Sequence, residues 1–219
     1  MHLQILITKN IVDIGGAGNW GYYYNMKGGY GGTRVDQNTE WVTLNENIAT
    51  GGNGTGRWVG GEDGPFAYLG RDHIWVDQGS YANANMEVSK SMIAYAWHSV
   101  PGLQKFGTFE GNGNSNGPFI NCGFRPALVI IKRLDTANDW NMQDYLRTTY
   151  NGLQTTTLQA NTDSTQETIG SDYRRDILSN GFKIWNSGTE TNASGGTYLY
   201  MAWAYQPFNN MYGGQSNAR

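Results

Sequence analysis

The chain contains two similar segments, each bounded by the same kinds of apolar run. In each segment an apolar run ends in lysine, a loop follows with Asn or Asp before Trp, and an apolar run closes on tryptophan. Such self-similarity is typical of repeated structural units. We therefore expect two diverged copies of one unit. The matched pairs are Gln4–Lys9 with Ala127–Lys132, Asn19–Trp20 with Asp139–Trp140, His73–Trp75 with Lys183–Trp185, and Ile93–Trp97 with Leu199–Trp203.

The order of these pairs predicts the domain boundaries. We expect a diverged first copy over residues 1–102, a second copy over 103–208, and a C-terminal arm over 209–219. Before the second copy's opening strand, Phe106–Phe109 and Pro118–Phe124 flank a Gly/Asn run, which predicts a hairpin.

Composition and apolar spacing favour sheets. Glycine accounts for 31 of 219 residues, and Tyr and Trp for 14 and 8. Short apolar runs alternate with Gly/Asn/Ser/Thr clusters, and the best helical candidate, Asp139–Tyr150, lacks a clean apolar stripe. We therefore predict an all-β fold with two tandem, jelly-roll-like β-sandwich units related by the internal repeat.

Several classes of function are disfavoured. A net charge of −3 disfavours nucleic-acid binding, which usually needs a basic surface patch. We expect the basic pair Arg174–Arg175 in a solvated turn. The apolar runs Met92–Trp97 and Ala127–Ile131 are too short to insert into a membrane, and the N-terminus lacks the features of a signal peptide. The single cysteine, Cys122, predicts a buried thiol without a disulfide or cysteine-based zinc site.

No catalytic, metal or cofactor site is predicted. Gly16–Gly21 matches a dinucleotide-binding glycine pattern, but the residues after it cannot sustain the helix that the pattern requires. The three histidines do not have metal-ligand spacing. Three loop pairs of acidic residues leave Ca²⁺ binding or glycoside hydrolysis open as alternatives. These pairs are Glu62 with Asp63, Asp135 with Asp139, and Asp163 with Glu167.

Aromatic residues are the candidate contact surface. Tyr and Trp offer flat apolar faces with a polar tip, which suit sugar rings or protein partners. Packing between subunits or in the core is the alternative. The tryptophans that recur in both copies, Trp75, Trp97, Trp185 and Trp203, are expected in the core. The candidate surface residues are Tyr22, Tyr23, Tyr24, Tyr30, Trp58 and Trp140.

The second copy carries a series of motifs in a fixed order. The series resembles a repeat domain of unknown function found in marine bacteriophage and cyanophage tail-fibre proteins, whose closing strand reads Y-x-A-W. Asn180 stands where that family has Asp, and the first copy lacks the D-x-x-R and asparagine-turn motifs. The segments of this chain are Val129–Arg133, Asp144–Arg147, Leu158–Thr162, Asn180–Phe182 and Tyr200–Trp203. At these places the family typically reads V-x-I-K-x-R, D-x-x-R, L-x-x-N-x-T, D-G-F and Y-x-A-W.

The resemblance implies a non-enzymatic virion protein, assembled in the host cytoplasm. It implies a tail-fibre or receptor-binding role, or capsid decoration, and we expect a homotrimer that contacts other phage particle proteins or a host surface glycan. A carbohydrate-binding module and a polysaccharide depolymerase are the alternative functions.

Overall fold

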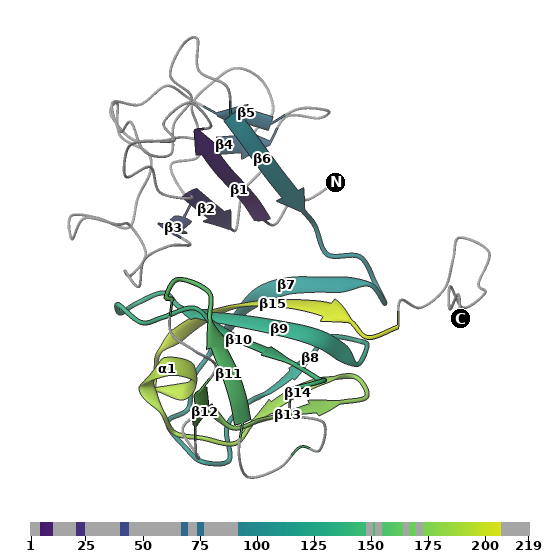
Figure 1. The fold of residues 1–219 in the computed structure, drawn as a ribbon, viewed down its shortest axis with the longest axis vertical. Coiled ribbons are helices and arrows are strands. Elements are labelled where there is room, and N and C mark those ends of the chain that lie inside the picture. The colour runs from purple at the N-terminus through teal and green to yellow at the C-terminus, as the bar shows by residue number, and fades with distance from the viewer. Residues whose placement is uncertain are drawn as a thin grey trace. The chain divides into compact units, whose positions relative to one another are not determined.

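The computed structural model divides the chain into two compact units, Met1–His98 and Ser99–Arg219. It describes residues 5–10, 21–24, 40–43, 67–69, 74–76, 92–147, 151, 155–163, 167–169 and 173–206. Side chains are described for residues 95, 97–147, 151, 156–163 and 173–206. Figure 1 shows the strands of both units.

The described part of the first unit consists of antiparallel strands. Four form a sheet in the order β3-β2-β1-β6, and β4 pairs with β5. Ile5 lies opposite Trp97 across β1 and β6, and Ile7 lies opposite Tyr22 across β1 and β2. The strands are β1 (Ile5–Asn10), β2 (Gly21–Tyr24), β3 (Glu40–Thr43), β4 (Ala67–Leu69), β5 (Ile74–Val76) and β6 (Met92–Trp97).

The second unit has a large antiparallel sheet in the order β12-β11-β10-β9-β15-β7. Its centre is β9 against β15, where Leu128 lies opposite Trp203. Both strands are rich in β-branched and aromatic residues, which fit a pleated buried surface. The strands are β7 (Gln104–Glu110), β9 (Pro126–Arg133), β10 (Asn141–Asp144), β11 (Thr155–Gln159), β12 (Glu167–Ile169) and β15 (Thr197–Ala204).

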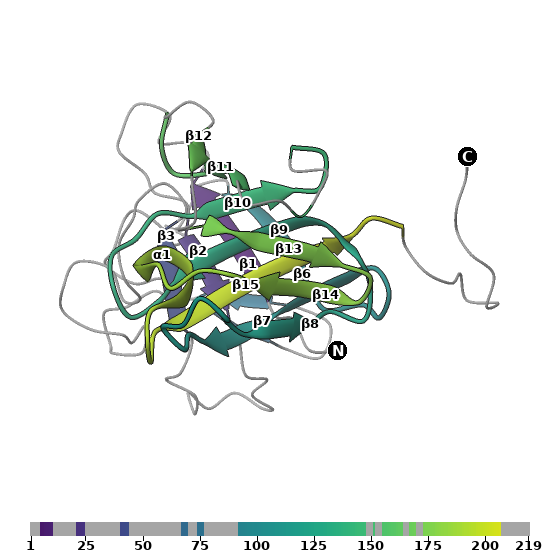
Figure 2. The ribbon, with the colours of Figure 1, turned by 90° about the horizontal axis from the view of Figure 1, so that it is seen from below.

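A small sheet, in the order β13-β14-β8, packs on one face of the large sheet. Figure 2 shows β13 (Arg175–Leu178) and β14 (Gly181–Ile184) lying across β9 and β15; β8 is Phe119–Asn121. Side chains from both sheets share one buried core, so the unit is sandwich-like. The core comprises Ile120, Cys122, Phe124, Val129, Ile131, Ile177, Phe182, Ile184, Tyr198, Tyr200 and Ala202.

The central strand β15 is buried on both of its faces. Tyr198, Tyr200 and Ala202 point into the core, and the alternate residues Leu199 and Met201 are buried as well. Strands buried on two sides read as continuous apolar runs. This explains why a periodicity of two is hard to see in this part of the sequence.

The hairpin predicted between Phe106–Phe109 and Pro118–Phe124 is wrong. β7 pairs with β15 in the large sheet, whereas β8 pairs with β14 in the small one. The Gly/Asn run between them therefore crosses from one sheet to the other. Asn side chains cap this crossing, since Asn112 Oδ1 accepts from the Asn114 amide and Asn114 Oδ1 from the Asn116 amide.

The prediction of an all-β class is confirmed across the described residues, where one four-residue helix, α1 (Thr189–Asn192), accompanies the strands. No helix within these residues could cross a membrane. The prediction that Trp97, Trp185 and Trp203 are core residues is wrong, because each is only half-buried. The side chain of Trp75 lies outside the described side chains.

Candidate functional site

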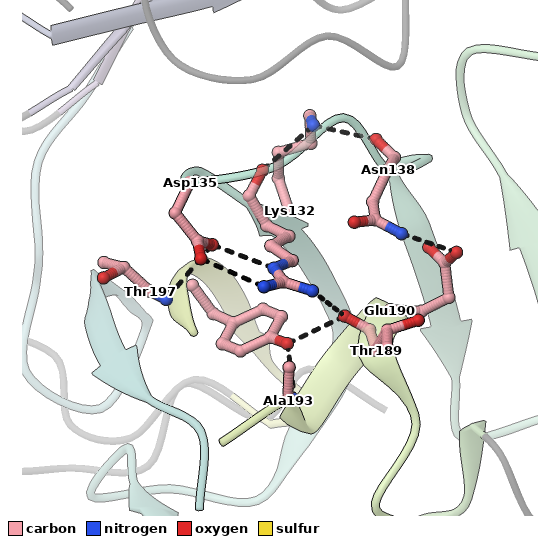
Figure 3. Close-up of polar contacts among 9 residues, drawn as sticks. Lys132, Asp135, Asn138, Thr189, Glu190, Ala193 and Thr197 are labelled. Atoms are coloured by element: carbon pink, nitrogen blue, oxygen red, sulfur yellow. Dashed lines mark hydrogen bonds and ion pairs between the residues drawn. The ribbon is translucent and has the colours of Figure 1, made fainter. Parts of the chain in front are cut away.

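The lysine of the V-x-I-K-x-R motif is buried at the end of β9. Lys132 Nζ donates to the carbonyl oxygens of Asn138, at 2.8 Å, and Arg133, at 3.0 Å (Figure 3). Burial lowers the pKa of Lys132 to about 8, although carboxylates of Asp139, Glu190 and Asp135 act in the opposite direction. The Lys132 ammonium thus holds the loop that follows β9 in place.

Arg133, which directly follows this lysine, joins the loop to the helix. Arg133 makes two hydrogen bonds to the Asp135 carboxylate, at 2.9 and 3.0 Å, and donates to the Thr189 carbonyl at 3.1 Å. The hydrogen bond from Arg133 lowers the pKa of Asp135. The Tyr198 hydroxyl donates to the same Thr189 carbonyl, at 2.8 Å, and accepts from the Ala193 amide, at 2.7 Å (Figure 3).

A half-buried carboxyl group completes this cluster. Asn138 Nδ2 donates to Glu190 Oε1 at 2.6 Å. Burial raises the pKa of Glu190. The Lys132 cluster, which we define as Lys132, Arg133, Asp135, Asn138 and Glu190, therefore joins the loop after β9 to α1.

Two further motifs also hold backbone turns. In the asparagine turn, Asn161 Oδ1 accepts from the Trp140 amide and Asn161 Nδ2 donates to Asp139, both at 2.8 Å. In the D-x-x-R motif, Asp144 Oδ1 accepts from the Arg147 amide at 2.9 Å, and the two side chains form an ion pair. The Asp144 contact is local, as expected for a turn, whereas Asn161 joins two loops that are about 20 residues apart in the sequence.

The glycine of the last turn motif is sterically required. The Gly181 Cα lies so close to the Ile120 carbonyl that a Cβ there would clash with its oxygen. The preceding Asn180 carbonyl accepts from the amides of Cys122, at 2.8 Å, and Gly123, at 3.0 Å. This turn thereby connects β14 to the segment after β8.

The prediction of a solvated turn at Arg174–Arg175 is wrong. Both residues border or lie in β13, and Arg175 is only 1% exposed because its side chain enters the interior of the unit. Its guanidinium donates to Gln143 Oε1 at 2.9 Å and to Asn141 Oδ1. Burial lowers the pKa of Arg175 to about 9. The half-buried Arg174 stacks over the ring of Trp185 instead.

The opposite end of the large sheet carries an exposed aromatic group. Backbone hydrogen bonds hold the neighbouring strand ends side by side. The Tyr145 amide donates to Ala127 O at 3.0 Å, and the Tyr205 amide donates to Arg125 O at 2.8 Å. The Tyr145 and Tyr205 rings meet edge to face, with centroids 4.5 Å apart. The Arg125 guanidinium lies 5.8 Å from the Tyr205 ring centroid. We call Arg125, Tyr145, Leu146 and Tyr205 the sheet-end rim.

The rim is accessible. Tyr205 is 43% exposed and Leu146 67%, and Arg125 is exposed as well. None of these residues was predicted from the sequence as a contact residue. Only Tyr205 carried a signal, because it follows the expected closing strand Leu199–Trp203, beyond which side chains leave the core.

The candidate surface residues have mixed outcomes. Trp140 is fully buried, so it is not part of an exposed surface. Tyr22, Tyr23 and Tyr24 lie in β2 rather than in a loop, and their side chains are outside the described side chains. Tyr30 and Trp58 lie outside the described residues.

Of the acidic pairs, Asp135 and Asp139 both act electrostatically on Lys132, and each already has a hydrogen-bond partner. Asp135 is held by Arg133, and Asp139 by Asn161. Asp163 is exposed; Glu62, Asp63 and the Glu167 side chain are not described. Among the described residues, no three His, Cys, Asp or Glu side chains are close enough to hold a metal ion. Cys122 is buried, as predicted, and burial raises the pKa of its thiol to about 11.

Residues 71–207 match the protein family described as Domain of unknown function (DUF7483). The chain belongs to this family. The family domain contains every motif described above and also β5 and β6 of the first unit. No curated protein and no solved structure matches the chain.

Proposed function

We propose that this protein is a non-enzymatic structural or receptor-binding component of bacteriophage particles. The support for a phage origin is the series of motifs from Val129–Arg133 to Tyr200–Trp203, which resembles phage tail-fibre repeat domains. The proposed role leaves tail and capsid positions open. A carbohydrate-binding module without a particle role and a polysaccharide depolymerase remain the alternatives.

One observation carries the proposed contact role: the motif side chains are used to hold loops. Lys132 and Arg133 bond to loop and helix carbonyls, Asn161 to Asp139 and the Trp140 amide, and Asp144 to Arg147. Catalytic groups are instead expected to face a substrate cleft with hydrogen-bonding capacity to spare. Among the described residues of the second unit, the sheet-end rim is an exposed surface suited to contact.

We also propose that the chain contains two copies of one jelly-roll-like unit. The sequence match pairs Ile5 with Leu128 and Trp97 with Trp203. Independently, Ile5 lies opposite Trp97 in the first unit and Leu128 lies opposite Trp203 in the second. The same register in both sheets supports a common origin.

The neighbouring strands support the same relationship. Ile7 lies opposite Tyr22, and the matching pair in the second unit is Ile130 opposite Met142. The strand order β3-β2-β1-β6 also parallels β11-β10-β9-β15.

Mass spectrometry of purified particles from a phage that encodes this chain tests the particle role. We expect the chain at a fixed copy number relative to the major capsid protein. Detection only in the soluble fraction of the lysate would contradict the proposal.

The proposed homotrimer is tested separately by native mass spectrometry of the purified chain. A dominant species of three chains is expected at micromolar concentration. A stable monomer would contradict a trimer without affecting the particle assignment.

A further inference from the structure

We propose that the sheet-end rim binds an acidic saccharide, with a sugar ring against the Tyr145–Tyr205 pair and its carboxylate on Arg125. This inference rests on the proposed contact function and names the chemical class of the partner. Nothing in the family description assigns such a site.

The two tyrosine rings provide the apolar part of the surface. Their planes meet at 72°, with centroids 4.5 Å apart, so they form a corner rather than a continuous flat surface. Aromatic rings combine an apolar face with a polar hydroxyl tip. The C–H face of a pyranose ring complements the ring face, and the sugar hydroxyls complement the tyrosine hydroxyls.

Arg125 provides the charge. Its guanidinium lies over the Tyr205 ring, and among the described residues its side chain makes no hydrogen bond or ion pair, so its N–H donors are available to a ligand. Guanidinium groups bind carboxylates through two parallel hydrogen bonds. The nearest acidic side chain on the adjoining turn, Asp144, already pairs with Arg147, which limits its repulsion of an anion.

The rim is held rigidly, which reduces the entropic cost of binding. Each of its parts follows or precedes a strand of the large sheet, and backbone hydrogen bonds join Tyr145 to Ala127 and Tyr205 to Arg125. These same bonds disfavour a peptide partner. Peptides that add a strand to a sheet need free backbone donors, and the amides of Tyr145, Ala204 and Tyr205 are already bonded.

The test is calorimetric titration of the full chain with three defined probes: oligogalacturonate, its methyl ester and oligoglutamate. We expect saturable binding of oligogalacturonate that weakens with salt, and about tenfold weaker binding of the methyl ester because it lacks the charge. The Arg125→Ala and Tyr205→Ala variants should each lose about tenfold in affinity.

Phe119→Ala is the matched control. Phe119 is 44% exposed, like Tyr205, but lies in β8 of the small sheet, so its removal should leave the affinity unchanged. Thermal unfolding of each variant verifies that it is folded. Absence of saturable oligogalacturonate binding, equal binding by Arg125→Ala, or equally tight binding of oligoglutamate would overturn the inference.

The two proposals fail in different ways. If the chain is present in particles but does not bind oligogalacturonate, the saccharide inference fails and the particle role stands. If the rim binds the saccharide but the chain is absent from particles, the particle role fails and the carbohydrate-binding alternative replaces it.

Discussion

The Lys132 ammonium lies 2.8 Å from the carbonyl oxygen of Asn138, six residues further along the chain. This contact closes the loop between β9 and β10 around a buried cation. Because Lys132 is fully buried, its charge is used to satisfy backbone oxygens rather than to bind a partner from solvent. Lys132 is thus part of the fold, and substituting it should change the free energy of unfolding.

Replacing Lys132 with methionine should destabilise the protein by about 2 kcal/mol, because two carbonyl oxygens lose their donor inside the protein. Urea unfolding measures this change. Lys105→Met is the matched control: Lys105 is only half-buried and makes one hydrogen bond, to Asn121 O, so we expect a cost of about 0.5 kcal/mol. Equal effects of the two substitutions would contradict the structural role.

The free energies of unfolding of wild type and Lys132→Met should depend differently on pH. The folded-state pKa of Lys132 is lowered to about 8 from 10.5, so the unfolded chain binds more protons between these values. The contribution of Lys132 to stability therefore rises as pH increases from about 8 to 10.5. We expect the stability difference between wild type and Lys132→Met to grow over this range. A constant difference would show that the lysine is not buried as described.

Arg175 and Gln143 should be energetically coupled. Arg175→Met leaves Gln143 Oε1 without its donor and should cost about 2 kcal/mol. Adding Gln143→Met removes the orphaned acceptor, so the double variant should cost about 1 kcal/mol less than the sum of the single variants. A double-mutant cycle by chemical denaturation measures the coupling, and strict additivity would contradict it.

Gly181→Ala should be among the most damaging single substitutions, at about 3 kcal/mol or more. Its Cβ would meet the Ile120 backbone, which cannot move without breaking the pairing of β14 with β8. Gly123→Ala is the control, because Gly123 has φ 77° but no neighbour to clash with. Backbone strain alone should cost about 1 kcal/mol there. The difference in Tm between the two variants tests this steric account.

Asn161→Ala should release the loop that contains Trp140. The Trp140 amide would lose its acceptor, and we expect its hydrogen exchange to accelerate while the exchange of β15 amides stays slow. Asn121→Ala provides the comparison, since Asn121 is exposed and its side-chain Oδ1 accepts from the Gly123 amide, two residues away. Unchanged protection at Trp140 would mean that other contacts hold the loop.

The sequence was sufficient to predict the all-β class and the opening and closing strands, because apolar runs bounded by Lys132 and Trp203 are local signals. It was insufficient for strand pairing across the 111–117 run, since β7 and β8 both read as strands and only tertiary packing assigns them to different sheets. Arg175 was misplaced for a related reason. Its basic neighbour Arg174 suggested a turn, whereas its buried partners, Gln143 and Asn141, are distant in sequence.

The candidate site was the least predictable part. Aromatic residues were chosen as a class, but Trp140 is buried and the rim residues Tyr145 and Tyr205 were overlooked. Residues that follow strand ends become a surface only when the sheet order places those ends side by side. That order depends on the pairing of β10, β9 and β15, which the sequence does not encode locally.

Electron cryomicroscopy of particles from a phage that encodes this chain tests the central claim most directly. We predict ordered density for several copies of the two-sheet unit at symmetry-related positions, with the Lys132 cluster enclosed within each copy and the rim of Arg125, Tyr145 and Tyr205 facing outward or against another chain. Particles without such density, together with release of oligosaccharides by the purified chain, would contradict it.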